Sequence, residues 1–224
     1  MTRQTHRILI GSLGWQHDAW QGDYYPEDLP PEWRLGYYSN EFPLLVITEQ
    51  ERTAQAELAE EMASCREDLQ VLIMVAPAAA DPAPTLAAAL ALLRQLPRDG
   101  GLLLQVNPAT ISDPDAWLGQ VQAQLAQVPV CVDPVARLND AWREALSRRG
   151  IGWSWNAHSD SEGLKVGPLA VIRLDGTVSP QQLRERIEAG LAASDETRKV
   201  ALLFAGTPPQ LVAMRQAKTI EELM

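Results

Sequence analysis

The chain has 224 residues, of which 46% are hydrophobic, and it carries a formal net charge of −10 with a pI near 4.8. This length is sufficient for one large core, and the apolar fraction is that of a globular protein, so an intrinsically disordered chain is excluded. The negative charge repels phosphate backbones and anionic membrane surfaces, which disfavours nucleic acid as a partner.

The N-terminal segment indicates no targeting signal. Residues 1–7 are polar, and the apolar run that follows them, residues 8–10, is too short for a signal peptide. No stretch of the sequence approaches the roughly 18 apolar residues that a membrane-spanning helix needs. We therefore expect a cytoplasmic protein without a membrane partner.

Eight short apolar runs are expected to form strands. Their apolar residues are continuous rather than alternating, which is typical of strands that are buried on both faces of a parallel sheet. The expected strands are residues 7–12, 44–48, 69–75, 101–106, 128–133, 151–155, 169–174 and 200–204.

Helical stretches lie between these strands. Several of them begin with a Ser, Thr or Asp side chain followed by proline, a pattern in which the side-chain oxygen caps a backbone amide and proline opens the first turn. The expected helices are residues 32–39, 53–65, 84–95, 114–127, 139–149, 180–193 and 208–217.

This alternation of strands and helices predicts a parallel sheet with right-handed crossovers. Eight such units favour closure into an α/β, TIM-barrel-like (β/α)8 fold, with an open doubly wound sheet as the alternative. The sixth crossover, residues 156–168, is polar and contains glycine, so we expect the barrel to be irregular there. No linker interrupts the pattern, and residues 1–224 are expected to form a single (β/α) barrel-like domain.

In a parallel barrel the ligand site lies at the C-terminal ends of the strands. The most informative segment there is residues 11–20, which follow the first strand and are rich in Gly and Trp. Paired glycines permit a tight turn and a close approach of the backbone to a ligand. The candidate ligand-binding residues at the ends of the expected strands are Trp15, His17, Trp20, Gln105, Asn107, Asp133 and Arg173.

Most of these candidates have a structural as well as a functional interpretation. Trp15 and Trp20 could line one side of a ligand site, or they could fill the end of the barrel and hold a long loop in place. Arg173 interrupts an apolar strand, so its charge must be paired or face the mouth of the barrel. It could hold an anion through its bidentate fork, or it could form an ion pair with Asp133. His17 could act as an acid or base, or it could be an ordinary surface histidine.

Motifs for cofactors and metals do not occur in the sequence. There is no P-loop, no GxSxG elbow and no HExxH, and the glycines of residues 11–14 do not match the dinucleotide fingerprint. Cys65 and Cys131 are far apart and are expected to be buried thiols. We therefore expect no cofactor and no metal site, and the sequence identifies no catalytic residue.

The opening of the chain has a recognisable pattern. It reads I-G-S-L-G-W from Ile10 to Trp15, followed by Trp20 and then by Tyr25-Pro26, and later segments read L-Q-V-N-P at residues 104–108 and A-V-I-R-L at residues 170–174. On these residues the chain resembles the DUF72, or YecE-like, family, as a short and divergent member. The resemblance implies a TIM-barrel fold with a ligand site at its mouth, and it implies no established reaction.

The chain departs from this family pattern on several strands. The family's glutamate and asparagine on the second strand correspond to Val46 and Thr48, its Arg-His pair has no match near Asp133, and its histidine after the seventh strand corresponds to Asp175. The loss of these polar groups indicates weakened or altered activity. Two functions stay open: a barrel that binds a small anionic or sugar-like ligand, and a non-catalytic barrel that acts through a protein partner.

Overall fold

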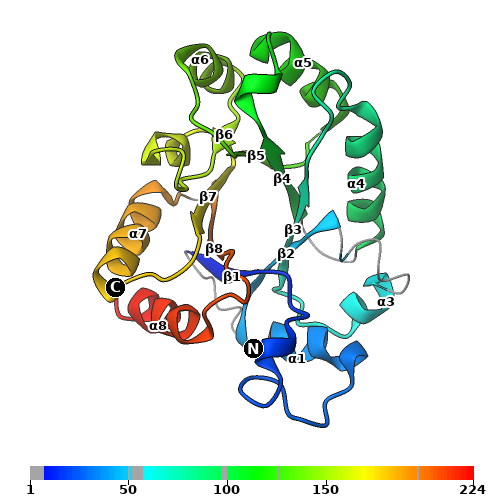
Figure 1. Cartoon of the computed structure of the whole chain (residues 1–224), viewed down its shortest axis with the longest axis vertical. Helices are drawn as coiled ribbons and strands as arrows, with labels where there is room; N and C mark the ends of the chain where they lie inside the picture. Colours follow the sequence, from blue (N-terminus) through cyan, green and yellow to red (C-terminus); the bar gives the residue numbers. More distant parts are fainter. Residues whose placement is uncertain (1–7, 50, 52–57, 97–99, 126, 196) are drawn as a thin grey trace.

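The structure is a computed structural model that describes residues 8–49, 51, 58–96, 100–125, 127–195 and 197–224. Eight parallel strands form one sheet in the order β6-β5-β4-β3-β2-β1-β8-β7, and helices lie around its outside (Figure 1). The predicted TIM-barrel-like fold is therefore confirmed. The strands are β1 (Leu9–Leu13), β2 (Leu44–Ile47), β3 (Gln70–Val75), β4 (Gly100–Val106), β5 (Val130–Pro134), β6 (Gly152–Trp153), β7 (Leu169–Leu174) and β8 (Lys199–Phe204).

The barrel closes between β6 and β7. β6 has only 2 residues, and the chain continues into an isolated bridge with β7. In this bridge the Trp155 amide donates to the Val171 carbonyl at 2.8 Å, and the Trp155 carbonyl accepts from the Arg173 amide at 3.0 Å. The expected irregularity after the sixth strand is present, as a shortened strand followed by a 3-10 turn at Ser161–Lys165.

The helices follow the expected order. α7 begins with a capping box in which Ser179 and Gln182 exchange hydrogen bonds. The helix expected at residues 53–65 lies partly outside the described residues, and the last helix begins after the two prolines that were expected to open it. Within the described ranges, every helix falls short of the length and apolar character that a bilayer span demands. The helices are α1 (Arg34–Glu41), α3 (Leu58–Ala63), α4 (Ala83–Gln95), α5 (Pro114–Leu125), α6 (Asp140–Arg148), α7 (Pro180–Ala193) and α8 (Leu211–Glu222).

Apolar side chains fill the interior of the barrel. Two further apolar clusters lie outside the strands, one under α1, α3, α7 and α8 and the other under α4, α5 and α6. Because the centre of the barrel is filled, it leaves no room for a ligand there. Ligand sites of parallel barrels lie at the barrel mouth, by which we mean the C-terminal ends of the strands and the loops that follow them. The inner cluster includes Leu44, Val46, Leu72, Leu103, Cys131, Leu169, Val171, Ala201 and Leu203.

Candidate functional site

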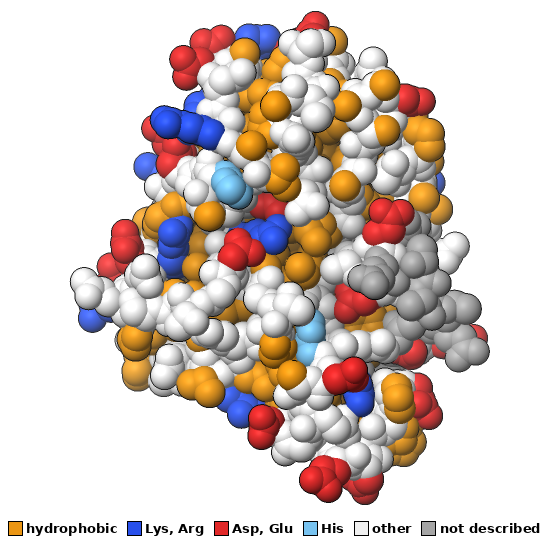
Figure 2. All heavy atoms as spheres, viewed as in Figure 1, with side chains coloured by type: hydrophobic (Ala, Val, Ile, Leu, Met, Phe, Trp, Pro, Cys, Tyr) orange, Lys and Arg blue, Asp and Glu red, His pale blue; other side chains and the backbone are white. Residues whose placement is uncertain are grey.

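The barrel mouth carries a cluster of polar residues on neighbouring strands. Asp133 lies in β5, Ser154 and Asn156 follow β6, and Arg173 lies in β7. The exposed fraction is 1% for Asp133, 0% for Ser154 and 7% for Asn156. Figure 2 shows the molecule from this side, with acidic and basic side chains meeting in a hollow near the centre of the face. Polar groups as deeply buried as these require hydrogen-bond partners.

Asp133 receives hydrogen bonds from all of these neighbours. Its Oδ1 accepts from Ser154 Oγ at 2.5 Å and from Asn156 Nδ2 at 2.9 Å, and its Oδ2 accepts from Nη1 of Arg173. Asn156 Nδ2 also donates to the Pro134 carbonyl at 2.9 Å. A buried carboxylate is stable in this form because it is both paired and hydrogen-bonded. The ion pair with Asp133, one of the two interpretations of Arg173, is therefore formed.

Arg173 is shared between two carboxylates. Besides its bond to Asp133, its Nε donates to Oδ1 of Asp175 at 3.0 Å. Burial alone would lower the pKa of Arg173, but the charges of Asp133 and Asp175 raise it overall. The guanidinium of Arg173 is therefore positively charged and is bonded by a carboxylate on each of two sides. Its Nη2 takes part in neither of these bonds.

The two polar candidates from β4 lie in different surroundings. Gln105 pairs in register with Asp133 across β4 and β5 and is half-buried, so it reaches the same layer of the mouth. Asn107 is exposed, and its Oδ1 accepts from the Ala109 amide at 3.1 Å, which caps the 3-10 turn Pro108–Thr110. The structure thus places Gln105 level with Asp133 on the neighbouring strand and uses Asn107 as a local cap.

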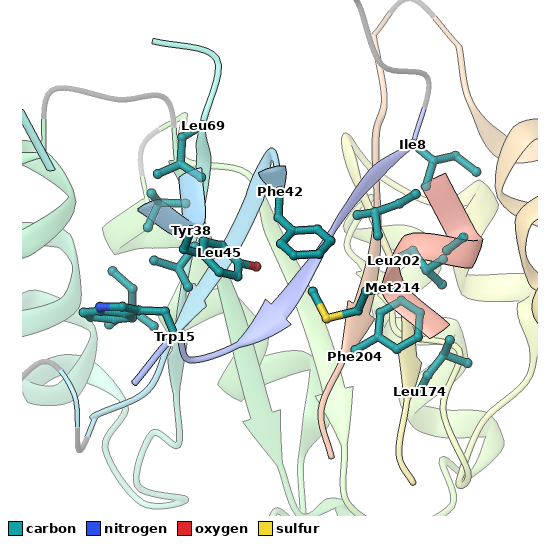
Figure 3. Close-up of a cluster of buried hydrophobic side chains, with 14 of the residues drawn as sticks. Ile8, Trp15, Tyr38, Phe42, Leu45, Leu69, Leu174, Leu202, Phe204 and Met214 are labelled. Carbon is teal, nitrogen blue, oxygen red and sulfur yellow. The ribbon is translucent and has the colours of Figure 1, made fainter. Parts of the chain in front are cut away.

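The two tryptophan side chains of the opening loop point into the protein and are buried. The exposed fraction is 0% for Trp15 and 2% for Trp20, and Nε1 of Trp20 donates to the Pro209 carbonyl at 3.2 Å. Figure 3 shows Trp15, Tyr38 and Leu45 among the side chains of the apolar cluster under α1, α3, α7 and α8. This arrangement agrees with the structural interpretation, in which the aromatic rings hold the loop down. In this conformation neither ring offers a face to a ligand.

His17 packs against the same loop. Its Nε2 lies 3.1 Å from the Leu13 carbonyl, and its ring centroid lies 4.5 Å from that of Trp20. Burial lowers the pKa of His17, despite the backbone contacts with Leu13 and Gly14 that raise it. The neutral ring therefore prevails at neutral pH, and a role for His17 in ligand binding stays a prediction.

Glu51 connects the opening loop to the end of β2, and it was not among the candidates. Its Oε2 accepts from the amide and the hydroxyl of Thr48, both at 3.0 Å, and the Glu51 amide donates back to Thr48 Oγ1 at 3.2 Å. Its Oε1 accepts from the Trp15 amide at 3.3 Å. Burial raises the pKa of Glu51. The reciprocal bonds follow the T-x-x-E capping-box pattern, which is visible in the sequence.

A pocket of about 150 Å³, which we call the mouth pocket, opens beside Arg173 between the end of β7 and α7. Arg186 contributes to it from α7 and was not a candidate, because an arginine among the charged residues of an amphipathic helix is typical of a solvated face. The residues that line the mouth pocket are Asn156, Ala157, Arg173, Leu174, Asp175, Thr177, Val178, Gln182 and Arg186.

The function of this site is indicated neither by a cluster of metal ligands among the described residues nor by similarity to a known protein. In the part of the chain that the structure describes, no three His, Cys, Asp or Glu side chains come together as ligands for a metal ion. Comparison with protein-family models and with curated proteins finds no match to this chain. A function must therefore be argued from the geometry and chemistry of the mouth itself.

Proposed function

We propose that this chain binds a small anionic or sugar-like ligand in the mouth pocket. The observation that carries the proposal is the place of the pocket, directly beside the guanidinium of Arg173 and above the buried Asp133. Ligand sites of parallel barrels lie at this end of the strands. We also propose, on the opening loop and the seventh strand, that the chain is a divergent relative of the DUF72 family.

The polar cluster gives this pocket a rigid floor. Asp133 and Asp175 hold Arg173 from two sides, and Asn156 is fixed by its bonds to Asp133 and Pro134. Donors that are already oriented bind a ligand without the loss of side-chain entropy that free arginines would suffer. The floor therefore suits selective recognition of a small polar molecule.

We propose binding rather than turnover. Asp133 is 1% exposed, and both of its oxygens accept hydrogen bonds, so it can take a proton from a ligand only if the cluster breaks. Asp175 lines the pocket, but it is paired with Arg173 at 3.0 Å. These contacts serve to position groups, and they leave no acid–base pair poised at the pocket among the described residues.

The alternative is a barrel that acts as a protein-interaction module. One observation favours it: the exposed fraction is 65% for Trp33 and 39% for Tyr37, which lie four residues apart at the start of α1. Single exposed apolar side chains are common on protein surfaces, and one pair covers a small area. We therefore place the ligand-binding proposal first.

The proposal is tested by a thermal-shift screen against sugar phosphates, nucleotides and carboxylates. Arg173→Ala alone would leave a buried carboxylate unpaired, so the informative variant is Asp133→Asn/Arg173→Gln, which removes both charges and keeps hydrogen-bonding groups. Arg148→Gln serves as a matched control, because Arg148 lies on α6 and its side chain is 63% exposed.

A ligand that stabilises the wild type is expected to lose most of its thermal shift in the double variant and to keep it in the control. A saturating ligand at about 100 times its Kd contributes roughly 2.7 kcal/mol to the wild type, which is readily measured. An equal shift in the double variant would exclude Arg173 from the site and contradict the proposal.

A further inference from the structure

Arg186 is a cation that no carboxylate contacts in the described part of the chain, although the charge of the neighbouring Glu185 acts on it. Its guanidinium carbon lies 3.4 Å from the ring centroid of Trp155, and its buried Nη1 has no hydrogen-bond partner among the described residues. Burial lowers the pKa of Arg186. Stacking on an indole fixes the plane of a guanidinium and leaves its edge for an in-plane anion.

Two other arginines, one in the lining of the mouth pocket and one on α7, have carboxylate partners. Arg184, two residues earlier in α7, has a side chain that is 69% exposed and pairs with Glu188 at 2.8 Å. Arg173 pairs with both Asp133 and Asp175. Among these three arginines, Arg186 is the one whose charge is not compensated by a contacting carboxylate.

The charges around the pocket decide where a negative group belongs. Arg173 shares its positive charge between Asp133 and Asp175, so this charge is already compensated and Arg173 offers a ligand hydrogen bonds through its remaining N–H groups. Arg186 adds a positive charge that no contacting carboxylate compensates, although the neighbouring Glu185 acts on it electrostatically. The negative group of a ligand is therefore favoured at Arg186, and a doubly charged ligand is disfavoured by its repulsion from Asp175.

The remaining polar groups of the lining suit hydroxyl groups. Asp175 uses Oδ1 in its ion pair, which leaves Oδ2 as an acceptor, and Gln182 uses Oε1 in the capping box, which leaves Nε2 as a donor. Thr177 Oγ1 accepts from Gln210 Nε2 at 3.1 Å, and its own proton can be donated. An acceptor and two donors thus lie in the lining of one small pocket.

We propose that the mouth pocket takes a small monocarboxylate that carries hydroxyl groups, a sugar acid in chemical class. The edge of Arg186 holds the carboxylate, and Asp175 and Gln182 hold the hydroxyls. The pocket, at about 150 Å³, is many times the roughly 10–15 Å³ that one water molecule requires. This inference rests on the proposed function and adds to it an anchor residue and a ligand class.

The test is isothermal titration of the full chain with D-glucuronate, D-glucose, acetate and inorganic phosphate. Wild type is compared with Arg186→Gln, and Arg184→Gln on the same helix is the matched control. Glucuronate is expected to bind most tightly, and Arg186→Gln is expected to weaken it by about tenfold or more, because a charge-assisted bidentate contact is lost. Arg184→Gln is expected to bind like the wild type.

Arg186→Lys keeps the charge but not the planar fork, so it is expected to weaken glucuronate binding less than Arg186→Gln does. It also keeps the test decisive if the Gln variant does not fold. Glucuronate binding that is the same in wild type and in these variants overturns the inference, as does tighter binding of phosphate, and both results leave the proposed function standing. If glucuronate does not bind the wild type, the inference fails, and the wider thermal-shift screen judges the proposed function separately.

Discussion

At the scale of single residues, the barrel mouth depends on one buried carboxylate. Asp133 is 1% exposed, and its charge is tolerated because Arg173, Ser154 and Asn156 bond to its two oxygens. An unpaired buried charge destabilises a protein strongly, whereas a neutral pair of similar shape costs little.

The first prediction concerns this pair. Arg173→Ala leaves Asp133 buried and unpaired, and we expect the free energy of unfolding to fall by about 3–5 kcal/mol. Asp133→Asn/Arg173→Gln leaves no buried charge and is expected to lose clearly less. Urea unfolding of both variants and of the wild type measures the difference. If the double variant is as unstable as Arg173→Ala, the pairing of charges is not what stabilises the mouth.

A second prediction concerns Glu51 and pH. Burial raises the pKa of Glu51 above its ordinary value of 4.5, so the folded chain holds this proton more tightly than the unfolded chain does. Between the two pKa values the folded state binds more protons, and the contribution of Glu51 to stability therefore falls as the pH rises through this window. Glu51→Gln keeps an acceptor for the Thr48 amide and cannot ionise.

We therefore expect the unfolding free energy of Glu51→Gln to improve relative to wild type as the pH rises above about 4, and the difference to level off above the pKa of the folded protein. Urea unfolding at a series of pH values measures this difference. A difference that does not change with pH, or that shifts in favour of the wild type, would show that Glu51 is not desolvated in the folded protein.

The sequence could indicate some of these residues and not others. Asp133 and Arg173 stand out because charged groups inside apolar runs must be paired or functional. The T-x-x-E pattern of Glu51 is visible, but nothing local shows that its second oxygen reaches the first loop. The surroundings of Arg186 depend on which face α7 turns inward and on Trp155 from a distant segment, so they are a property of the tertiary structure.

At the scale of elements, the opening loop depends on backbone conformation as much as on its aromatic residues. Gly14 has a φ of +73°, and a Cβ atom added there would lie 2.3 Å from Oε1 of Glu51. Gly176, in the loop after β7, has nearly the same φ of +72°, but a Cβ atom there would meet nothing within 4 Å. Substitutions at these two glycines therefore separate the energetic cost of the left-handed backbone from the cost of a steric clash with Glu51.

The third prediction uses this contrast. Gly176→Ala is expected to cost only the left-handed backbone conformation, about 1–2 kcal/mol. Gly14→Ala has the same backbone cost and also displaces Glu51, so it is expected to be less stable than Gly176→Ala. Thermal or urea unfolding of the two variants compares them directly. Equal losses would mean that Glu51 moves aside freely and does not hold the loop.

The number and order of the strands could be predicted because each is a continuous apolar run that a parallel sheet buries on both faces. The length of the sixth strand could not be predicted in this way. Residues 151–155 read as one strand, but only Gly152 and Trp153 pair with β5, and Trp155 pairs with Ile172 of β7 instead. A local pattern does not show that a short segment changes from one neighbour to the other within three residues.

At the scale of the whole molecule, this change of neighbour makes the junction of β6 and β7 the narrowest connection around the barrel. Cys131 lies in β5 directly beside it, pairs in register with Gly152, and is 0% exposed in the barrel interior. Burial raises the pKa of the Cys131 thiol well above its ordinary value, which also makes it unreactive. Its reactivity therefore reports on whether the barrel opens.

The last prediction follows from this position. In a Cys65→Ser variant, labelling of Cys131 by a thiol reagent under native conditions is expected to require global unfolding, with a urea dependence equal to that of equilibrium unfolding. In a Cys131→Ser variant, Cys65 is expected to react faster, because it follows the short helix α3 at the outside of the barrel and local opening is enough to expose it.

If Cys131 reacts as fast as Cys65 and without urea dependence, the barrel opens at the β6–β7 junction while the rest stays folded. The floor of the mouth pocket, which spans this same junction through Asp133, Asn156 and Arg173, would then be formed only part of the time.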